Sequence, residues 1–381
     1  MTALNRPQEC ITRADPEVTE WDRQTFLRLV STRLTPVQED QVRHPPQSYP
    51  QQDAVLGVHW HPEFVPLELI LERVRATFPH HRSQLIIPTQ HNELMTLGAY
   101  AGVEIDCYSP EFDLKVQLLA HFAAAKLEGA AAFKAMLART FRYRATQLHE
   151  LIDSILEPAH NDRVEKAADR TGASPELVRF VRVQVGKIRQ LIERNESATR
   201  PDMLKNKLLR NFFNALHDRY EPAILHHAQL FLLAVKKIVK AEFKPSHFHR
   251  TQEVIEEVRG LGGCLVVPHP EQFWPILLAD YDVDGIEVWN PQSQQYTEFL
   301  IHVVVRQNRA RRNGDRHLLL FMGDDTHFGE KVVEPDRQDP EKAGRELGVQ
   351  PAWEHASIGP KLRLAKADRN SLIDQYKQRL G

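Results

Sequence analysis

The stretch Ala54-Val55-Leu56-Gly57-Val58-His59-Trp60-His61 joins an apolar run to two histidines that are separated by one residue. On an extended strand, side chains two positions apart point to the same side, so His59 and His61 can bind one cation. Such a pair alone is more often a surface or packing feature than a pair of ligands. The pair is a stronger indication of metal ligands in this chain, because other apolar runs are also followed by imidazole and carboxylate side chains.

The other segments of this kind lie farther along the chain, and each follows or ends an apolar run. They are Gln90-His91-Asn92-Glu93, Val267-Pro268-His269-Pro270 and Gly323-Asp324-Asp325-Thr326-His327. Asp325 and His327 are again two residues apart, whereas Asp324 must point to the opposite side of a strand. Barrel enzymes build their sites from side chains gathered at one end of several parallel strands. Together, the segments predict a metal site at strand ends.

Composition limits the ligands and partners that the chain can use. Its 381 residues exceed a typical single domain, and 49 basic against 51 acidic residues give a net charge of −2. A chain so close to neutrality has no global attraction to nucleic acid, although a local basic groove is compatible with it. The cysteines Cys10, Cys107 and Cys264 include no Cys-x-x-Cys pair. Neither a disulfide framework nor a thiolate zinc site is expected, which leaves imidazoles and carboxylates as ligands.

No targeting signal is apparent in the sequence. The start, Met1-Thr2-Ala3-Leu4-Asn5-Arg6-Pro7, lacks the apolar stretch of a signal peptide. Other apolar runs fall far short of the ~20 residues needed to span a bilayer. We therefore expect a soluble protein of a reducing compartment, cytoplasmic in location and without a membrane partner.

The pattern of apolar residues divides the chain into parts. Residues 1–52 are predicted to be an N-terminal extension that ends in a proline- and glutamine-rich linker. Residues 53–121 and 241–332 alternate strands with helices, which predicts a parallel α/β sheet or barrel. Residues 122–240 have helical spacing almost throughout, which indicates a helical insertion. The C-terminal segment, residues 333–381, is rich in loops until a closing helix over residues 370–380.

Individual elements can be placed within the α/β parts. Strands are predicted over residues 54–59, 84–88, 103–108, 264–267, 285–289 and 317–322, with a further strand over 113–119. Helices are predicted over residues 66–77, 93–100, 251–261, 271–279 and 292–312. Each histidine segment described above lies at or just after the end of one of these strands.

In motif and order, the chain resembles the polymerase and histidinol phosphatase (PHP) superfamily of metal-dependent phosphoesterases. The resemblance begins with the His-x-His motif of Val58-His59-Trp60-His61. The later motifs are Thr89-Gln90-His91-Asn92, Gly102-Val103-Glu104-Ile105, Gly262-Gly263-Cys264-Leu265-Val266-Val267-Pro268-His269-Pro270, Gly285-Ile286-Glu287-Val288-Trp289-Asn290 and Gly323-Asp324-Asp325-Thr326-His327. A helical insertion also occurs in a branch of this family that hydrolyses nucleotides and RNA ends. The resemblance implies an α/β fold, a distorted (β/α)7 PHP-type barrel with a large helical insertion.

The resemblance also implies ligands for one to three divalent transition metal ions. The implied first position consists of His59, His61, Glu104 and Asp325, which are also the implied catalytic residues, and all of them are present. Imidazole and carboxylate ligands together suit Mn, Fe or Zn and do not choose between them.

The implied second position departs from the family pattern. It would share Glu104 with His269 and with a histidine from the strand that follows the glutamate. Gln117 stands at the aligned place and is a poor ligand, whereas His121 is the alternative.

The implied third position would use His91, His327 and one further residue. Glu63 and Glu68 are both candidates for that ligand, and neither matches the spacing of the family. The aspartate that usually precedes the histidine of the second motif is Gln90 in this chain.

These implied sites favour a hydrolase or nuclease that cleaves phosphate esters. A bound metal can lower the pKa of its water to about 7, and two metals can stabilise both oxygens of an in-line displacement. The implied substrate is a nucleotide or nucleic-acid phosphodiester or monoester, with single-stranded nucleic acid included. One alternative, favoured by Gln117 and Gln90, is a non-catalytic PHP-fold scaffold or sensor with a partly eroded site. Another is metal-dependent hydrolysis of a C–N bond.

Two expectations concern the surroundings of the site. Glu287, at the end of its strand, either orients a histidine of the site or caps the next helix. The helical insertion is expected to lie over the metal end of the barrel and to narrow access to it.

Overall fold

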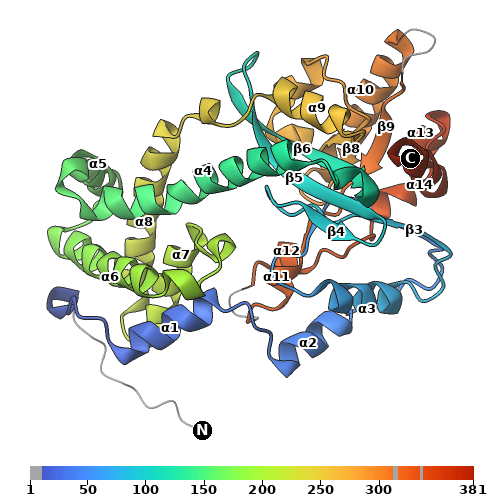
Figure 1. The fold of residues 1–381 in the computed structure, drawn as a ribbon. Helices are drawn as coiled ribbons and strands as arrows, with labels where there is room; N and C mark the ends of the chain where they lie inside the picture. Colours follow the sequence, from blue (N-terminus) through green and yellow to red (C-terminus); the bar gives the residue numbers. More distant parts are fainter. Residues whose placement is uncertain (1–10, 312–315, 335–337) are drawn as a thin grey trace. The chain divides into compact units, whose positions relative to one another are not determined.

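The structure, a computed structural model, describes residues 11–311, 316–334 and 338–381. By its internal contacts the chain falls into two compact units. One unit consists of Met1–Thr32 and Arg142–Lys244, and the other consists of Arg33–Phe141 and Pro245–Gly381. Each unit is therefore assembled from two separate stretches of the sequence, which the colours of Figure 1 allow the reader to follow.

The first unit is helical. It contains α1 (Glu20–Val30), most of α4 (Ala131–Leu156), α5 (Asn161–Thr171), α6 (Pro175–Arg194), α7 (Lys207–Ala215) and α8 (Pro222–Glu242). The start of α6 follows from its sequence, because Ser174 accepts a hydrogen bond from the Leu177 backbone N–H and Pro175 occupies the first turn. Phe26 and Val30 of α1 are buried in one core with α6, α7 and α8. The N-terminal helix thus belongs to the helical core, a role that the sequence did not indicate.

The second unit has a mixed α/β fold, which agrees with the predicted class. Its largest sheet has the strand order β4 (Met95–Leu97), β5 (Tyr100–Ser109), β6 (Leu114–Ala123), β7 (Cys264–Val267), β8 (Gly285–Trp289) and β9 (Leu319–Met322). In addition, β1 (Ala54–Gly57) pairs with β3 (Ser83–Ile86), and β2 (Trp60–His61) pairs with β10 (Thr326–His327), both in parallel. Among the described residues these are separate sheets that do not close into one barrel.

Helices cover the strands of the second unit (Figure 1). Apolar side chains of α14 (Arg369–Leu380), among them Leu372 and Tyr376, share a core with β1 and β3. Side chains of α9 (Thr251–Gly260) and α10 (Thr297–Ala310) share a second core with β5 to β9. Those of α3 (Leu67–Thr77) and α2 (Pro36–Arg43) contribute to a third. The short helices α11 (Phe328–Lys331), α12 (Pro340–Ala343) and α13 (Gly359–Leu364) lie in the C-terminal part.

The central strands differ from the predicted parallel arrangement. β5 and β6 form a long antiparallel hairpin, and both β4 and β7 pair with it in antiparallel fashion. In this sheet β7, β8 and β9 are parallel neighbours. The helix predicted over residues 93–100 is wrong, because Met95–Leu97 forms β4 and pairs with β5 across a turn at Gly98. The φ of 58° at Gly98 is one that glycine adopts without steric cost.

Two other predicted helices differ in type or extent. Residues 271–279 form the 3₁₀ helices Pro270–Gln272 and Trp274–Leu278, because Pro270 and Pro275 lack the N–H groups that a continuous α-helix requires. α10 begins at Thr297 after the 3₁₀ turn Gln294–Tyr296, and residue 312 of the predicted helix lies outside the described residues.

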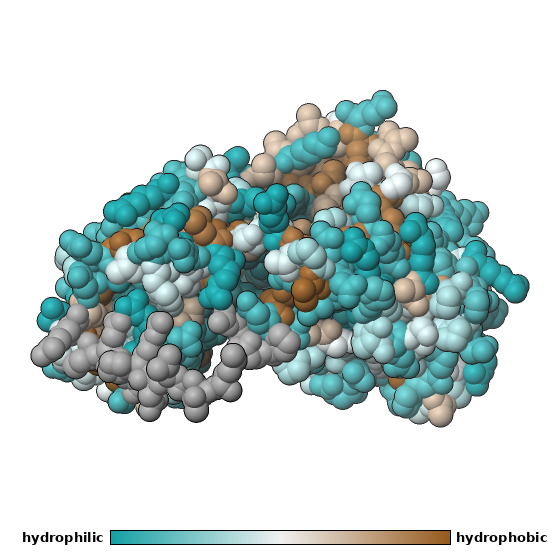
Figure 2. Space-filling view, turned by 90° about the horizontal axis from the view of Figure 1, so that it is seen from below, coloured by the Kyte–Doolittle hydropathy of each residue, from teal (hydrophilic) through white to brown (hydrophobic). Residues whose placement is uncertain are grey.

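Hydrophilic residues predominate on the face drawn in Figure 2, and hydrophobic residues form patches between them. Among the helices that the structure describes, none combines the length and the apolar character of a membrane-crossing segment.

Candidate metal centre

The ends of β1 and β9 bring His59, His61 and Asp325 together. His59 follows β1, and the Asp325 backbone N–H donates a hydrogen bond to the His59 carbonyl at 2.9 Å. Oδ1 of Asp325 lies 3.6 Å from Nε2 of His59 and 3.4 Å from Nε2 of His61. All three residues are buried, and one ligand atom from each lies within 4.8 Å of the others. They form a first group of potential metal ligands.

Glu104 of β5 connects this group to a second one, which consists of His59, Glu104 and His269. Its Oε1 lies 3.3 Å from Nε2 of His269, which follows β7, and 4.0 Å from Nε2 of His59. Its Oε2 lies 3.6 Å from Nε2 of His61. Since Glu104 is 1% exposed and its oxygens face different imidazoles, it can bridge two neighbouring cation positions.

β6 adds no ligand atom to the second group. The cross-strand partner of Glu104 is the apolar Leu119, and Gln117 is the next residue on the same face of β6. Both ring nitrogens of His121 are hydrogen-bonded, one to a backbone carbonyl at 2.9 Å and the other to the Tyr376 hydroxyl at 2.7 Å. Within the described residues, neither Gln117 nor His121 completes this group.

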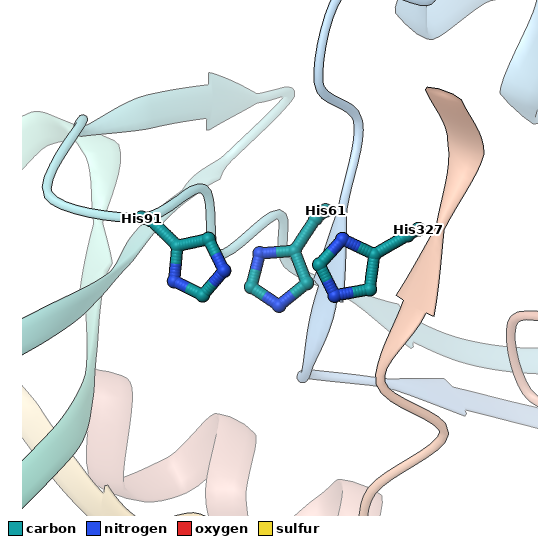
Figure 3. A group of neighbouring side chains, drawn as sticks. All are labelled: His61, His91 and His327. Carbon is teal, nitrogen blue, oxygen red and sulfur yellow. The ribbon is translucent and has the colours of Figure 1, made fainter. Parts of the chain in front are cut away.

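A third group consists of His61, His91 and His327, whose rings lie side by side in Figure 3. The ring of His61 stacks between the other two, with centroids 4.3 Å from each. The arrangement follows from the backbone, because His61 and His327 are paired residues of β2 and β10. His91 is held by an isolated parallel bridge to Glu104, and its Nδ1 contacts a carboxylate oxygen of that residue.

The two acidic candidates for this third group differ in position. Oε1 of Glu63 lies 3.4 Å from Nδ1 of His327. Its carboxylate occupies space that a Cβ at position 329 would fill, which is why Gly329 is suited to that place. Glu68 is instead exposed on α3. The geometry therefore favours Glu63.

Glu287 of β8 orients two residues of the site. Its Oε1 accepts a hydrogen bond from Nδ1–H of His59 at 2.6 Å, and its Oε2 accepts one from the His269 backbone N–H at 2.9 Å. A Cβ at Gly323 would overlap this carboxylate, so the glycine makes room for it. A carboxylate that binds the far nitrogen of a ligating histidine is a common feature of metal sites.

Sequence reasoning missed two residues that contact Asp325. Its Oδ2 accepts hydrogen bonds from Gln292 Nε2 at 2.6 Å and from Arg345 Nη1 at 2.8 Å. No local pattern marks either residue as part of a site. Asp324 is buried but turned elsewhere, because its carboxylate accepts a hydrogen bond from the Gly348 backbone N–H at 2.9 Å.

Burial and neighbouring charges set the protonation of the site. Burial and the two imidazoles stacked on its ring lower the pKa of His61 to about 3. Although burial opposes a charged imidazole, Glu287 raises the pKa of His59 to about 10. Burial also opposes ionised carboxylates, but adjacent imidazoles hold the pKa values of Glu104 and Asp325 well below their ordinary range.

Backbone strain is concentrated around these ligands. Glu63, Asn92, His269 and Asp325 have φ angles of 54°, 55°, 25° and 46°. Residues other than glycine rarely adopt such angles, which cost of order 1–3 kcal/mol each and cluster at functional sites. The fold therefore holds these four residues in place against a local preference for other conformations.

The donor atoms fit divalent transition metal ions. Nε2 of His59 and Nε2 of His61 are buried, and neither has a hydrogen-bond partner within the described residues. A buried polar atom without a partner costs roughly 1–3 kcal/mol, which a bound cation would remove. Imidazoles combined with carboxylates suit Mn, Fe or Zn.

Comparison with known proteins adds little to this geometry. No family model and no curated protein sequence matches the chain. Among solved structures, the chain is similar to a "putative metal-dependent phosphoesterase" from Bifidobacterium adolescentis. The identity is 17%, the similarity covers 80% of this chain and 92% of that chain, and the TM-score is 0.39. Because a similarity this weak carries no argument, the functional assignment depends on the residues of the site.

Proposed function

We propose that the chain is a metal-dependent hydrolase of phosphate esters, with a PHP-type metal centre on its mixed α/β unit. The observation that carries the proposal is the overlap of the three ligand groups. His59 belongs to the first and second groups, and His61 belongs to the first and third. Overlapping groups suit cations that lie next to one another, whereas a structural zinc ion is normally enclosed by four ligands of its own. We propose one to three ions of Mn, Fe or Zn.

The residues of the site would have different roles. His59, His61, Glu104 and Asp325 would hold the first cation, with Glu287 fixing the His59 ring so that its Nε2 faces the ion. Cations beside it would be held by His269, His91 and His327. When bound, such ions supply Lewis acidity to a water molecule and to a phosphoryl oxygen. The buried ligands keep bulk water away, which strengthens the electrostatic interactions of the site.

As substrate we propose a nucleotide or nucleic-acid phosphodiester or monoester, single strands included. Adjacent cations can neutralise both the entering and the leaving oxygen of an in-line displacement at phosphorus, which supports a phosphoester as substrate. The order of the sequence motifs supports the same class.

A second candidate function is a PHP-fold scaffold or sensor that binds metal without catalysis. The observation in its favour is the apolar Leu119 opposite Glu104, which leaves β6 without a ligand. A site with fewer ligands can still hold one cation, and this candidate therefore predicts a single bound metal and no hydrolysis.

Metal content and hydrolysis, measured on the same preparation, separate the two candidate functions. The full chain is purified without chelator, its metals are counted by mass spectrometry, and it is assayed with Mn²⁺ on bis(p-nitrophenyl) phosphate and p-nitrophenyl phosphate. We expect at least one ion of Mn, Fe or Zn per chain and hydrolysis of one reporter. Bound metal without hydrolysis would favour the scaffold, and a chain that neither carries nor regains metal would contradict both functions.

A further inference from the structure

The two carboxylate oxygens of Asp325 face different surroundings. Oδ1 faces the imidazoles of the metal centre, with Nε2 of His61 and Nε2 of His327 each at 3.4 Å. Oδ2 faces away from them and is bound by Arg345 and Gln292, at 2.8 and 2.6 Å. The side chain is thus oriented from one side by residues that hold no ligand position of their own.

Arg345 binds the backbone of Asp325 as well as its carboxylate. The same Nη1 that binds Oδ2 also donates to the Asp325 backbone carbonyl at 3.1 Å. That backbone has a φ of 46°, a conformation that needs support from its surroundings. Arg345 itself is 6% exposed, so the guanidinium is enclosed and has few alternative positions.

A buried ionic network fixes the segment that carries Arg345. Lys331 of α11 donates to Oε1 of Glu346 at 2.8 Å and also binds the Arg345 carbonyl. Arg73 of α3 donates through Nε to Oε2 of Glu346 at 2.8 Å and through Nη1 to the Val42 carbonyl at 2.9 Å. The Arg345 carbonyl and the neighbouring Glu346 are therefore anchored to elements outside the metal centre.

The charge of Arg345 stabilises the ionised carboxylate of Asp325, but it does not itself favour a cation in the metal centre. A positive group beside a cation site repels the cation and weakens its binding. What Arg345 can supply is geometry, because its hydrogen bonds prevent Asp325 from rotating Oδ1 away from the imidazoles. Outer residues that orient ligands in this way typically contribute about 10- to 100-fold to metal affinity.

We propose that Arg345 is a positioning residue of the metal centre, which acts by fixing the carboxylate of Asp325 in its ligating orientation. The inference rests on the metal site of the proposed function, and it assigns a role to the C-terminal segment. It does not require that the substrate be a phosphoester.

Titration of the metal-free full chain with Mn²⁺ tests the proposal, with thermal unfolding measured on the same samples. Arg345→Met removes the donors and keeps much of the side-chain volume, whereas Arg345→Lys keeps the charge and one donor group. We expect Arg345→Met to raise the Kd for Mn²⁺ by roughly 10- to 100-fold. Arg345→Lys should recover part of that loss. The exposed Arg363→Gln is the matched control and should leave the Kd unchanged.

The direction in which the Kd for Mn²⁺ changes separates the possible roles of Arg345. Tighter Mn²⁺ binding in Arg345→Met would mean that Arg345 acts only as a repelling charge, and would overturn the proposal. An unchanged Kd with a lower melting temperature would mean a merely structural role and would overturn it as well. If Arg345→Met does not fold, Gln292→Met removes the other donor to Oδ2 at an exposed position. It should weaken Mn²⁺ binding by a smaller factor, and no weakening would contradict the proposal.

The outcome is distinguishable from failure of the proposed function. A chain that binds Mn²⁺ and responds to Arg345→Met as expected, but hydrolyses no phosphate ester, would refute the function and support the positioning role. A wild-type chain that binds no Mn²⁺ would refute both.

Discussion

Replacing Glu287 by glutamine tests whether the outer carboxylate controls the metal centre. Glutamine keeps the size of the side chain, but its amide offers one acceptor oxygen where the carboxylate offers two. In the native chain those two oxygens accept hydrogen bonds from Nδ1–H of His59 and from the His269 backbone N–H. In Glu287→Gln the NH₂ group must face one of these donors, so one of the two hydrogen bonds is lost.

The size of the effect follows from the bond that is lost. A hydrogen bond to a charged group contributes about 1.5–3 kcal/mol, and each 1.4 kcal/mol corresponds to a factor of ten in affinity. The lost hydrogen bond is one that holds either His59 or His269 in its ligating orientation. The Kd for Mn²⁺ should therefore rise by roughly 10- to 100-fold. The same range is typical of outer carboxylates in other metal sites.

Isothermal titration of the metal-free chain with Mn²⁺ measures this change. Glu68→Gln is the matched control, because Glu68 is exposed on α3, and its Kd should equal that of the wild type. A Kd for Glu287→Gln within a factor of about two of the wild type would refute the reasoning. It would show that the His59 ring keeps its orientation without the carboxylate.

Three further changes have expected outcomes. Asp325→Asn removes a charge shared by several imidazoles, so Mn²⁺ affinity and phosphoester hydrolysis should both fall by more than roughly 100-fold, while the exposed Asp374→Asn leaves them unchanged in the same titration and assay. Gly323→Ala places a methyl group against the outer carboxylate, so thermal unfolding should occur at a lower temperature and Mn²⁺ should bind more weakly. Although burial opposes its ionisation, Arg259 holds the pKa of Asp284 below its ordinary value. Such a lowered pKa gives stability that is present above the unfolded value of about 3.9 and is lost as the pH falls through the folded value. The difference in unfolding free energy between wild type and Asp284→Asn should therefore shrink below about pH 4, and urea denaturation between pH 3 and 6 measures it; a constant difference would contradict the assignment.

Most ligands of the site could be anticipated because they depend on a local pattern. An apolar run followed by alternating imidazoles predicts that His59 and His61 point to one side, and their side chains do converge on a common group with Asp325. His269 was also marked by the apolar run before it, whereas Glu104 has no such pattern, and only the resemblance in motif order singled it out. The structure brings both into the second group.

Features that depend on pairing between distant segments could not be anticipated. Residues 95–97 have an apolar content that suits a helix turn or a short strand, and the hydrogen bonds with β5 decide for the strand. The direction of β6 depends in the same way on its partner and not on its sequence. Arg345 has no marker at all, because a buried arginine looks like any surface arginine until its partner Asp325 is known.

The ligands of the metal centre are spread over much of the chain, beginning with His59 and ending with His327, and the helical residues 142–244 lie between them in the sequence. During synthesis, a nascent chain that stops before Asp325 lacks both Asp325 and His327 and so has no complete group around His61. We therefore expect the metal centre to be completed only after the segment through His327 has been synthesised. Contacts between segments so far apart in sequence form slowly, and apolar strands stay exposed in the meantime. The spread of the ligands therefore predicts that the metal centre forms late in folding, after the apolar strands have found their partners.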